Sequence, residues 1–104
     1  VIARKRRVQP DLFYVAIVDD AVVGTVLAGY DGVRGWVHKL AVSPSCRRMG
    51  IASMLMRRAE QGLADIGCTK LNLQVRSSNA EVLKFYQALG YAVEEITSLG
   101  KHLT

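Results

Sequence analysis

Arg47-Arg48-Met49-Gly50-Ile51-Ala52 lies between an apolar strand pattern and a long amphipathic helix pattern. Pro44 ends the strand, and Gly50 allows a tight turn before helical periodicity starts. The first N–H groups of a helix lack intrahelical acceptors and carry partial positive charge, so this junction can bind an anion. Two arginines add charge suited to phosphate. A turn this short also serves as punctuation between strand and helix, so support must come from the rest of the chain.

The segment after the turn has the apolar spacing of an amphipathic helix. Residues at steps of three and four form one stripe, and charged or amide side chains lie between them. The stripe consists of Ile51, Leu55, Ala59, Leu63 and Ile66. Gly67 is placed to end this helix as a C-terminal cap.

Three apolar runs before the turn predict strands, with Asp19-Asp20-Ala21 joining the first two as a hairpin. The runs are 12–18, 22–28 and 35–42. Apolar residues on both faces favour a sheet that is covered on both sides. Lys70 to Arg76 alternates strictly and predicts a further, half-buried strand.

The last third of the chain predicts a second helix and one or two strands. Ser77-Ser78-Asn79 is an N-cap cluster, Glu81 supports the first turn, and Gly90 ends the helix. Tyr91 to Ile96 predicts a strand, and 99–103 a short last one. The order is β-β-β-α-β-α-β, which predicts an α/β fold with a mixed central sheet and parallel pairing around the turn.

Length and charge set further bounds. The 104 residues predict one domain, 1–104, and the net charge of +5 suits a polyanionic ligand. We interpret Arg4-Lys5-Arg6-Arg7 as a solvated helix end or frayed terminus rather than a targeting or nucleic-acid segment. No apolar run is long enough to cross a membrane, and no signal-peptide pattern is present. No further cysteine or histidine stands at metal-ligand spacing from Cys46 or Cys68. We therefore expect free thiols in a reducing cytoplasm and no metal site.

Two motifs resemble those of the GNAT superfamily of acetyl-CoA-dependent N-acetyltransferases. Leu40-Ala41-Val42-Ser43-Pro44 followed by Arg47-x-x-Gly50-x-Ala52 matches the family's pyrophosphate motif, (Q/R)-x-x-G-x-(G/A). The block from Asn79 to Tyr91 matches its N-x-x-x-x-x-x-Y-x-x-x-G-(F/Y) signature. Two motifs in the right order, about thirty residues apart, are more specific than either alone. The chain looks most like the branch that holds ribosomal-protein alanine acetyltransferases and uncharacterised relatives.

The resemblance implies acetyl-CoA as co-substrate. Main-chain N–H groups from Arg48 through Ser53 would hold the pyrophosphate, and the small Gly50 and Ala52 would allow close approach. Leu40 and Val42 would pair with the pantetheine arm as with an added strand, which requires the third strand to splay from the strand at 71–75. The residues so assigned to acetyl-CoA are Leu40, Ala41, Val42, Arg47, Arg48, Met49, Gly50, Ile51, Ala52, Ser53 and Asn79.

Tyr86 is the predicted catalytic residue. In this family an amine attacks the thioester directly and CoA leaves as a thiolate, which a nearby tyrosine can protonate. A strand N–H near Leu40 would polarise the carbonyl oxygen. The alternative for Tyr86 is an aromatic core residue beside Phe85. Asn79 is a ligand of the pantetheine arm, an N-cap, or both.

The chain departs from the family pattern in two places. Relatives that acetylate protein N-termini carry a glutamate base where this chain has Gln74, which cannot take a proton. The base is then elsewhere, or the acceptor amine arrives neutral; the candidates are His38, Glu94 and Glu95. At the front, 1–9 can hold only a turn or two of the strand and two helices with which the family fold begins. The N-terminal elements would thus be shortened or missing, and the bare sheet edge predicts a homodimer or a missing N-terminal segment.

The sequence therefore predicts an N-acetyltransferase whose acceptor is a primary amine on a small molecule or a peptide N-terminus. The alternative is a catalytically weak or inactive acyl-CoA-binding module, on account of Gln74 and the short front. Nucleic acid is disfavoured as a partner, because the chain lacks aromatic platforms on a strand face and helix-turn-helix spacing.

Overall fold

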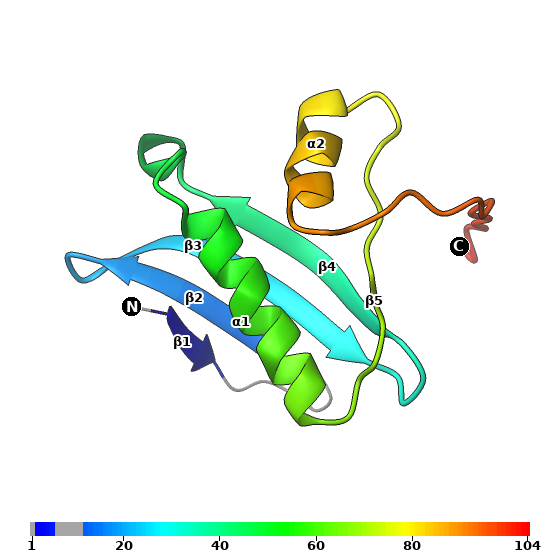
Figure 1. Cartoon of the computed structure of the whole chain (residues 1–104), viewed down its shortest axis with the longest axis horizontal. Helices are drawn as coiled ribbons and strands as arrows, with labels where there is room; N and C mark the ends of the chain where they lie inside the picture. Colours follow the sequence, from blue (N-terminus) through cyan, green and yellow to red (C-terminus); the bar gives the residue numbers. More distant parts are fainter. Residues whose placement is uncertain (1, 6–11) are drawn as a thin grey trace. The chain divides into compact units, whose positions relative to one another are not determined.

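A computed structural model describes residues 2–5 and 12–104 of the chain (Figure 1). The chain divides into two compact units, Val1–Gln74 and Val75–Thr104. The first unit holds β1 (Ile2–Lys5), β2 (Leu12–Val18), β3 (Ala21–Tyr30), β4 (Gly35–Val42), the 3₁₀ turn η1 (Pro44–Cys46), α1 (Ile51–Asp65) and β5 (Leu71–Asn72), and the second holds α2 (Ala80–Ala88). The sheet order is β1-β2-β3-β4-β5, with β4 and β5 parallel and the other pairs antiparallel. The predicted α/β fold with a mixed sheet is confirmed.

The two loops that join β2, β3 and β4 are built by aspartates. Asp19 and Asp20 have φ of +49° and +63°, a left-handed pair that matches the twist of a two-residue hairpin. In the next loop the Asp31 carboxylate accepts the N–H groups of Arg34 (2.8 Å) and Val33 (2.9 Å). These two hydrogen bonds lower the pKa of Asp31. The predicted hairpin is therefore present.

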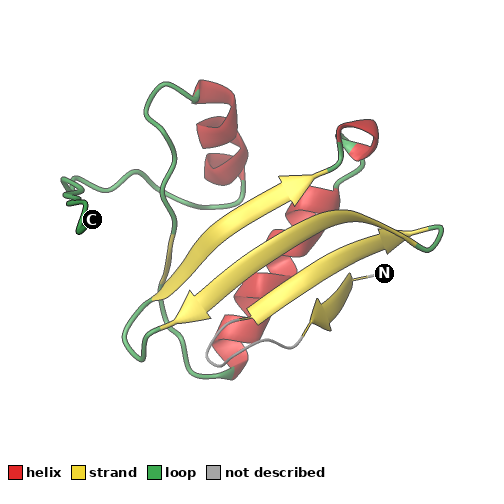
Figure 2. Ribbon diagram, turned by 180° about the vertical axis from the view of Figure 1, so that it is seen from behind, coloured by secondary structure: helices red, strands yellow, loops and turns green. Residues whose placement is uncertain are grey.

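Helix α1 lies across one face of β2, β3 and β4 (Figure 2). In the described part of the first unit, the buried apolar side chains on this face are Leu12, Tyr14 and Ala16 of β2, Val26 and Ala28 of β3, Val37 of β4, and Ile51, Leu55, Met56, Ala59 and Leu63 of α1; Val15 is buried on the opposite face. Each fully buried leucine contributes about 1.5–3 kcal/mol. Small residues bring the helix close, because a Cβ on Gly62 would overlap the Tyr14 hydroxyl and one on Gly24 would stand 2.9 Å from Leu55 Cδ1. The predicted stripe is confirmed up to Leu63, but Ile66 lies beyond the helix and is 46% exposed.

The opposite face of the sheet in the first unit carries apolar side chains too. The register places Phe13, Leu27 and Trp36 on this face, and all three are half-buried. The sequence predicted a sheet covered on both faces. Helix α1 covers one face, and cover of the other face stays a prediction. In the ranges that the structure describes, no helix is long and apolar enough to cross a membrane.

The N-terminal prediction is wrong for 2–5. These residues form β1, which pairs antiparallel with β2 from Ile2↔Ala16 to Lys5↔Phe13, where we expected the end of a helix. The free edge of β2 offers main-chain partners, and such pairing overrides a weak local pattern. Arg4 and Lys5 therefore belong to a strand, whereas Arg6 and Arg7 lie outside the described residues.

The strands predicted near the C-terminus are also wrong. The strand expected over 70–76 is reduced to Leu71–Asn72, and residues 91–104, all of them described, adopt neither helix nor strand. Alternation predicts the two faces of a strand but does not supply a partner, and β5 offers only two residues for pairing. The apolar side chains of Val93, Ile96, Leu99 and Leu103 are 68–92% exposed as a result. The observed order matches the prediction through α2, with β1 in front and no last strand.

Candidate active site

The turn between β4 and α1 has a strained left-handed backbone. The Ser43 N–H donates to the Val23 carbonyl (2.7 Å), which ties the end of β4 to β3 before η1 turns the chain. Arg48 and Gly50 then adopt φ of +67° and +77°. A Cβ added at Gly50 would meet no atom within 4 Å. Glycine is therefore favoured here because of its positive φ, and not because a side chain would lack room. Arg48 adopts the same region although it has a side chain.

Main-chain donors gather at the start of α1. The first helical hydrogen bond runs from the Met54 N–H to the Gly50 carbonyl (3.1 Å). Within the described part of the chain, the N–H groups of Ile51, Ala52 and Ser53 have no acceptor, and no side chain caps the helix. The first turn holds no acidic residue. Three donors at the positive end of the helix dipole therefore remain for an anion.

Two arginines lie beside these donors. Arg47 and Arg48 are exposed, as are Met49 and Gly50 between them and the helix. Neither guanidinium has a carboxylate partner among the residues that the structure describes. The phosphate site predicted from the sequence thus has its donors and its charges in one short segment.

The edge of β4 next to this turn is open over most of its length. β4 pairs with β3 throughout but with β5 only at Gly35↔Leu71 and Trp36↔Asn72, and no other strand in the described ranges lies on that edge. Because the Ser43 N–H points to β3, the alternating main-chain groups of Leu40 and Val42 point to the open edge. Beyond Trp36, this edge of β4 therefore has main-chain groups that no described strand pairs with, and the pantetheine site there stays a prediction.

A β-bulge interrupts β4 at His38. Ala28 of β3 pairs with Val37 and Leu27 pairs with Lys39, so His38 is the extra residue between them. The bulge places Val37 and Leu40, which are three residues apart, on the same face of the sheet. His38 and Lys39 are consecutive and both exposed. Our sequence interpretation missed this bulge, although the three-residue spacing of the apolar side chains was its signal.

The second unit holds Asn79 and Tyr86 on α2. The Asn79 side chain accepts the Val82 N–H (3.4 Å), so the predicted N-cap is present. The Tyr86 ring is 8% exposed and packs edge-to-face with Phe85 and Tyr91, at centroid distances of 5.1 and 5.7 Å. Burial raises the pKa of Tyr86. Its hydroxyl has no hydrogen-bond partner in 2–5 or 12–104, so a core ring carries an unengaged phenol.

The other side chains considered in the sequence analysis are the candidate bases and the two cysteines. Gln74, His38, Glu94 and Glu95 are all exposed. Cys46 and Cys68 are free thiols, as predicted. The described residues hold no cluster of three metal-ligating side chains.

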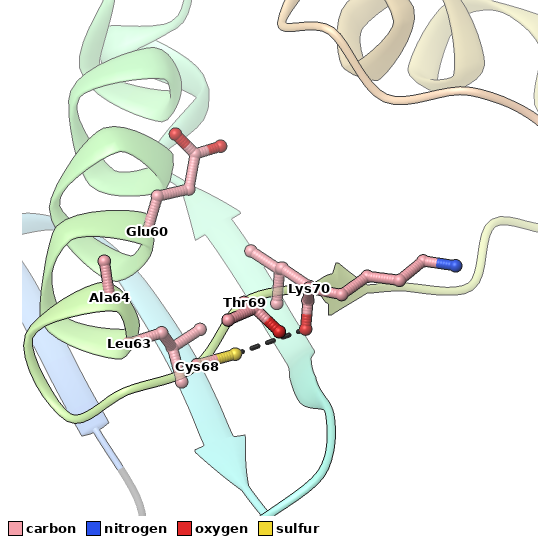
Figure 3. Close-up of a pocket in the computed structure, with 7 residues that line it drawn as sticks. Glu60, Leu63, Ala64, Cys68, Thr69 and Lys70 are labelled. Atoms are coloured by element: carbon pink, nitrogen blue, oxygen red, sulfur yellow. Dashed lines mark hydrogen bonds between the residues drawn. The ribbon is translucent and has the colours of Figure 1, made fainter.

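A shallow cavity of about 150 Å³ lies at the far end of α1 from the turn (Figure 3). Its lining consists of Glu60, Leu63, Ala64, Cys68, Thr69, Lys70 and Leu71. Two of these lining residues are joined by a hydrogen bond, from the Cys68 thiol to the Lys70 carbonyl (3.2 Å). The cavity is therefore separate from the donors at the helix start.

Comparison with known proteins identifies the family. The sequence profile of the acetyltransferase (GNAT) family matches residues 2–91. The chain belongs to the GNAT family. An acetyltransferase of Yersinia enterocolitica is 44% identical over 102 residues, which cover 98% of this chain and 72% of the relative. An acetyltransferase of Pectobacterium atrosepticum has the same identity and coverage. Its family and its relatives identify the chain as an N-acetyltransferase.

Solved structures of two aminoglycoside acetyltransferases share the fold. The aminoglycoside 6'-N-acetyltransferase AAC(6')-IG from Acinetobacter haemolyticus has a TM-score of 0.76 and 23% identity over 92% of this chain and 73% of that one. AAC(6')-Iy in complex with a CoA bisubstrate analogue has a TM-score of 0.78 and 22% identity over 88% and 69%. The match to the family profile and the 44% identical relative confirm the predicted superfamily. The ribosomal-protein alanine acetyltransferase branch stays a prediction, because the relatives' names specify no acceptor.

Proposed function

We propose that this GNAT enzyme transfers the acetyl group of acetyl-CoA to a primary amine in a ternary complex. The observation that supports it most is the set of three unpaired N–H groups at Ile51, Ala52 and Ser53 beside two unpaired arginines. These donors would bind the pyrophosphate, each charge-assisted hydrogen bond contributing about 1.5–3 kcal/mol. The CoA-derived ligand of AAC(6')-Iy, which has the same fold, supports CoA as the bound molecule.

The open edge of β4 would take the pantetheine arm. The arm contains two amide groups, and Leu40 and Val42 present main-chain groups on that edge, so the arm pairs as an added strand would. Ala41 lies between them with its main-chain groups towards β3. The thioester would then lie near Leu40, where a main-chain N–H of the strand would stabilise the oxyanion. Asn79, whose side-chain carbonyl caps α2, would donate its amide to the arm.

The chemical step needs one proton removed and one supplied. The amine nitrogen forms a bond to the thioester carbon, the C–S bond breaks, and CoA leaves as a thiolate. Tyr86 would donate its phenolic proton to that sulfur. Because burial raises the pKa of Tyr86, the phenol is protonated at neutral pH, as an acid must be.

The acceptor is a primary amine of a small molecule or a peptide N-terminus. Aminoglycoside acetyltransferases share the fold, so an aminoglycoside belongs in the acceptor panel. We further propose a cytoplasmic homodimer. Two free thiols favour a reducing compartment, and the open strand edges of the first unit favour a partner.

Calorimetry with acetyl-CoA and a thiol-release assay test the proposal together. The thiol assay uses neamine, spermidine, lysine and an alanyl peptide with a free N-terminus. We expect binding at micromolar acetyl-CoA and thiol release with at least one amine. Binding without release would indicate the acyl-CoA-binding module instead, and no heat at sub-millimolar acetyl-CoA would refute the pyrophosphate assignment.

A further inference from the structure

The bulge in β4 lies where the reacting end of acetyl-CoA is expected. This inference rests on the proposed function, in which the pyrophosphate sits at the start of α1 and the arm runs back along β4. The proposed function places the thioester beside Leu40, and His38 lies two strand steps, about 7 Å, before Leu40 on the same strand. The bulge at His38 is therefore close to the expected position of the thioester.

The bulge also gives His38 an unusual presentation. In a regular strand His38 would point to the face that α1 covers, because Val37 and Lys39 would flank it on the other face. The extra residue instead turns His38 to the same side as Lys39, and both are exposed. The imidazole has no hydrogen-bond or ionic partner among the described residues. It is therefore accessible to a molecule that lies along the open edge.

The neighbours of His38 do not compete for its proton. Across the bulge, β3 presents Leu27 and Ala28, which do not ionise, and α1 packs on the opposite face of the sheet. Lys39 is the charged neighbour on β4 itself, and it carries no acceptor for a proton. Gln74, after β5, cannot accept a proton. Histidine is the side chain best suited to accept one near neutral pH.

We propose that His38 is the general base of the reaction. Its neutral imidazole takes the proton from the acceptor amine while the nitrogen forms the C–N bond to the thioester carbon. The resulting imidazolium returns its proton to water after the amide is released. The bulge is thus the device that places a base at the reacting end of the arm.

The kinetic test uses the full chain as wild type, H38Q and the matched control H102Q, which removes the other histidine. With the best amine of the acceptor panel, H102Q should keep the kcat/KM and the pH profile of the wild type. For H38Q we expect a loss of about 100-fold at pH 7 and a rate that instead follows deprotonation of the amine up to pH 9. The calorimetric Kd for acetyl-CoA should stay within twofold in both variants.

Three results would overturn the assignment. They are an H38Q rate within threefold of wild type, an unchanged pH profile, or an acetyl-CoA Kd that rises in step with the lost rate. If no panel amine is accepted, histidine NMR decides: acetyl-CoA should shift the His38 ring signals and leave those of His102 in place, and an unmoved His38 signal refutes the proposal. Failure of the proposed function is distinguishable, because it shows as absent acetyl-CoA heat in the wild type.

Discussion

Alanine substitutions at Gly50 and Gly32 should have the same effect on stability but different effects on acetyl-CoA binding. Their φ values are +77° and +94°, and a Cβ added at either position meets no atom within 4 Å. Alanine in the left-handed region costs about 1–2 kcal/mol, and the loss of glycine's flexibility in the unfolded chain returns about 0.5–1 kcal/mol. Gly50→Ala and Gly32→Ala should therefore each lower the free energy of unfolding by about 0.5–1 kcal/mol. In a domain of this size that lowers Tm by about 2–8 °C.

Only one of the two variants should affect acetyl-CoA. Gly50 begins the helix whose free N–H groups would hold the pyrophosphate, whereas Gly32 lies in the β3–β4 loop. A methyl group at Gly50 would stand against the phosphates, and we expect at least a tenfold weaker Kd, about 1.4 kcal/mol. Gly32→Ala should stay within twofold of wild type. Urea unfolding measures the first effect and calorimetry the second; equal affinities at equal stability would refute the phosphate site.

Further substitutions test the other roles. Tyr86→Phe should slow thiol release about 100-fold at an unchanged acetyl-CoA Kd. Burial raises the pKa of Tyr86 in the folded state. The protonated phenol therefore contributes stability below the unfolded pKa near 10, and this contribution is lost as the pH rises further. The Tm of the wild type should fall more steeply between pH 9 and 11 than the Tm of Tyr86→Phe. Gly62→Ala, whose Cβ overlaps the Tyr14 hydroxyl, should destabilise by about 1–3 kcal/mol, and Tyr14→Phe should relieve part of this in a circular-dichroism melt. Asn79→Ala should cost about 1 kcal/mol as a lost cap, whereas Asn79→Ser keeps a capping oxygen, so weaker CoA binding in the serine variant would report the contact with the arm. Sedimentation should give twice the 11.4 kDa of the chain, and a purely monomeric species would contradict the dimer.

The structural elements around the candidate site that were predicted correctly are those that local chemistry specifies. Gly50 permits a left-handed turn, the spacing from Ile51 to Leu63 produces an amphipathic helix, and Asn79 caps α2. Each depends on residues within a few positions of one another, so the sequence pattern carries them without knowledge of the fold. The proposal of an anion site at the start of α1 rests on these local rules together with the family motif.

Strand pairing depended on partners far away in the chain. β1 forms because the edge of β2 is available for pairing, and β5 is limited to Leu71–Asn72 because only these two residues pair with β4. The alternation in 70–76 and the apolar residues of 91–96 carried no information on a partner. The bulge at His38 likewise arises from the register between β3 and β4. Thus the sequence alone determined the helix, its turn and its caps, whereas the tertiary structure decided which strands pair and where the edge stays open, because a strand is stable only with a hydrogen-bonded neighbour.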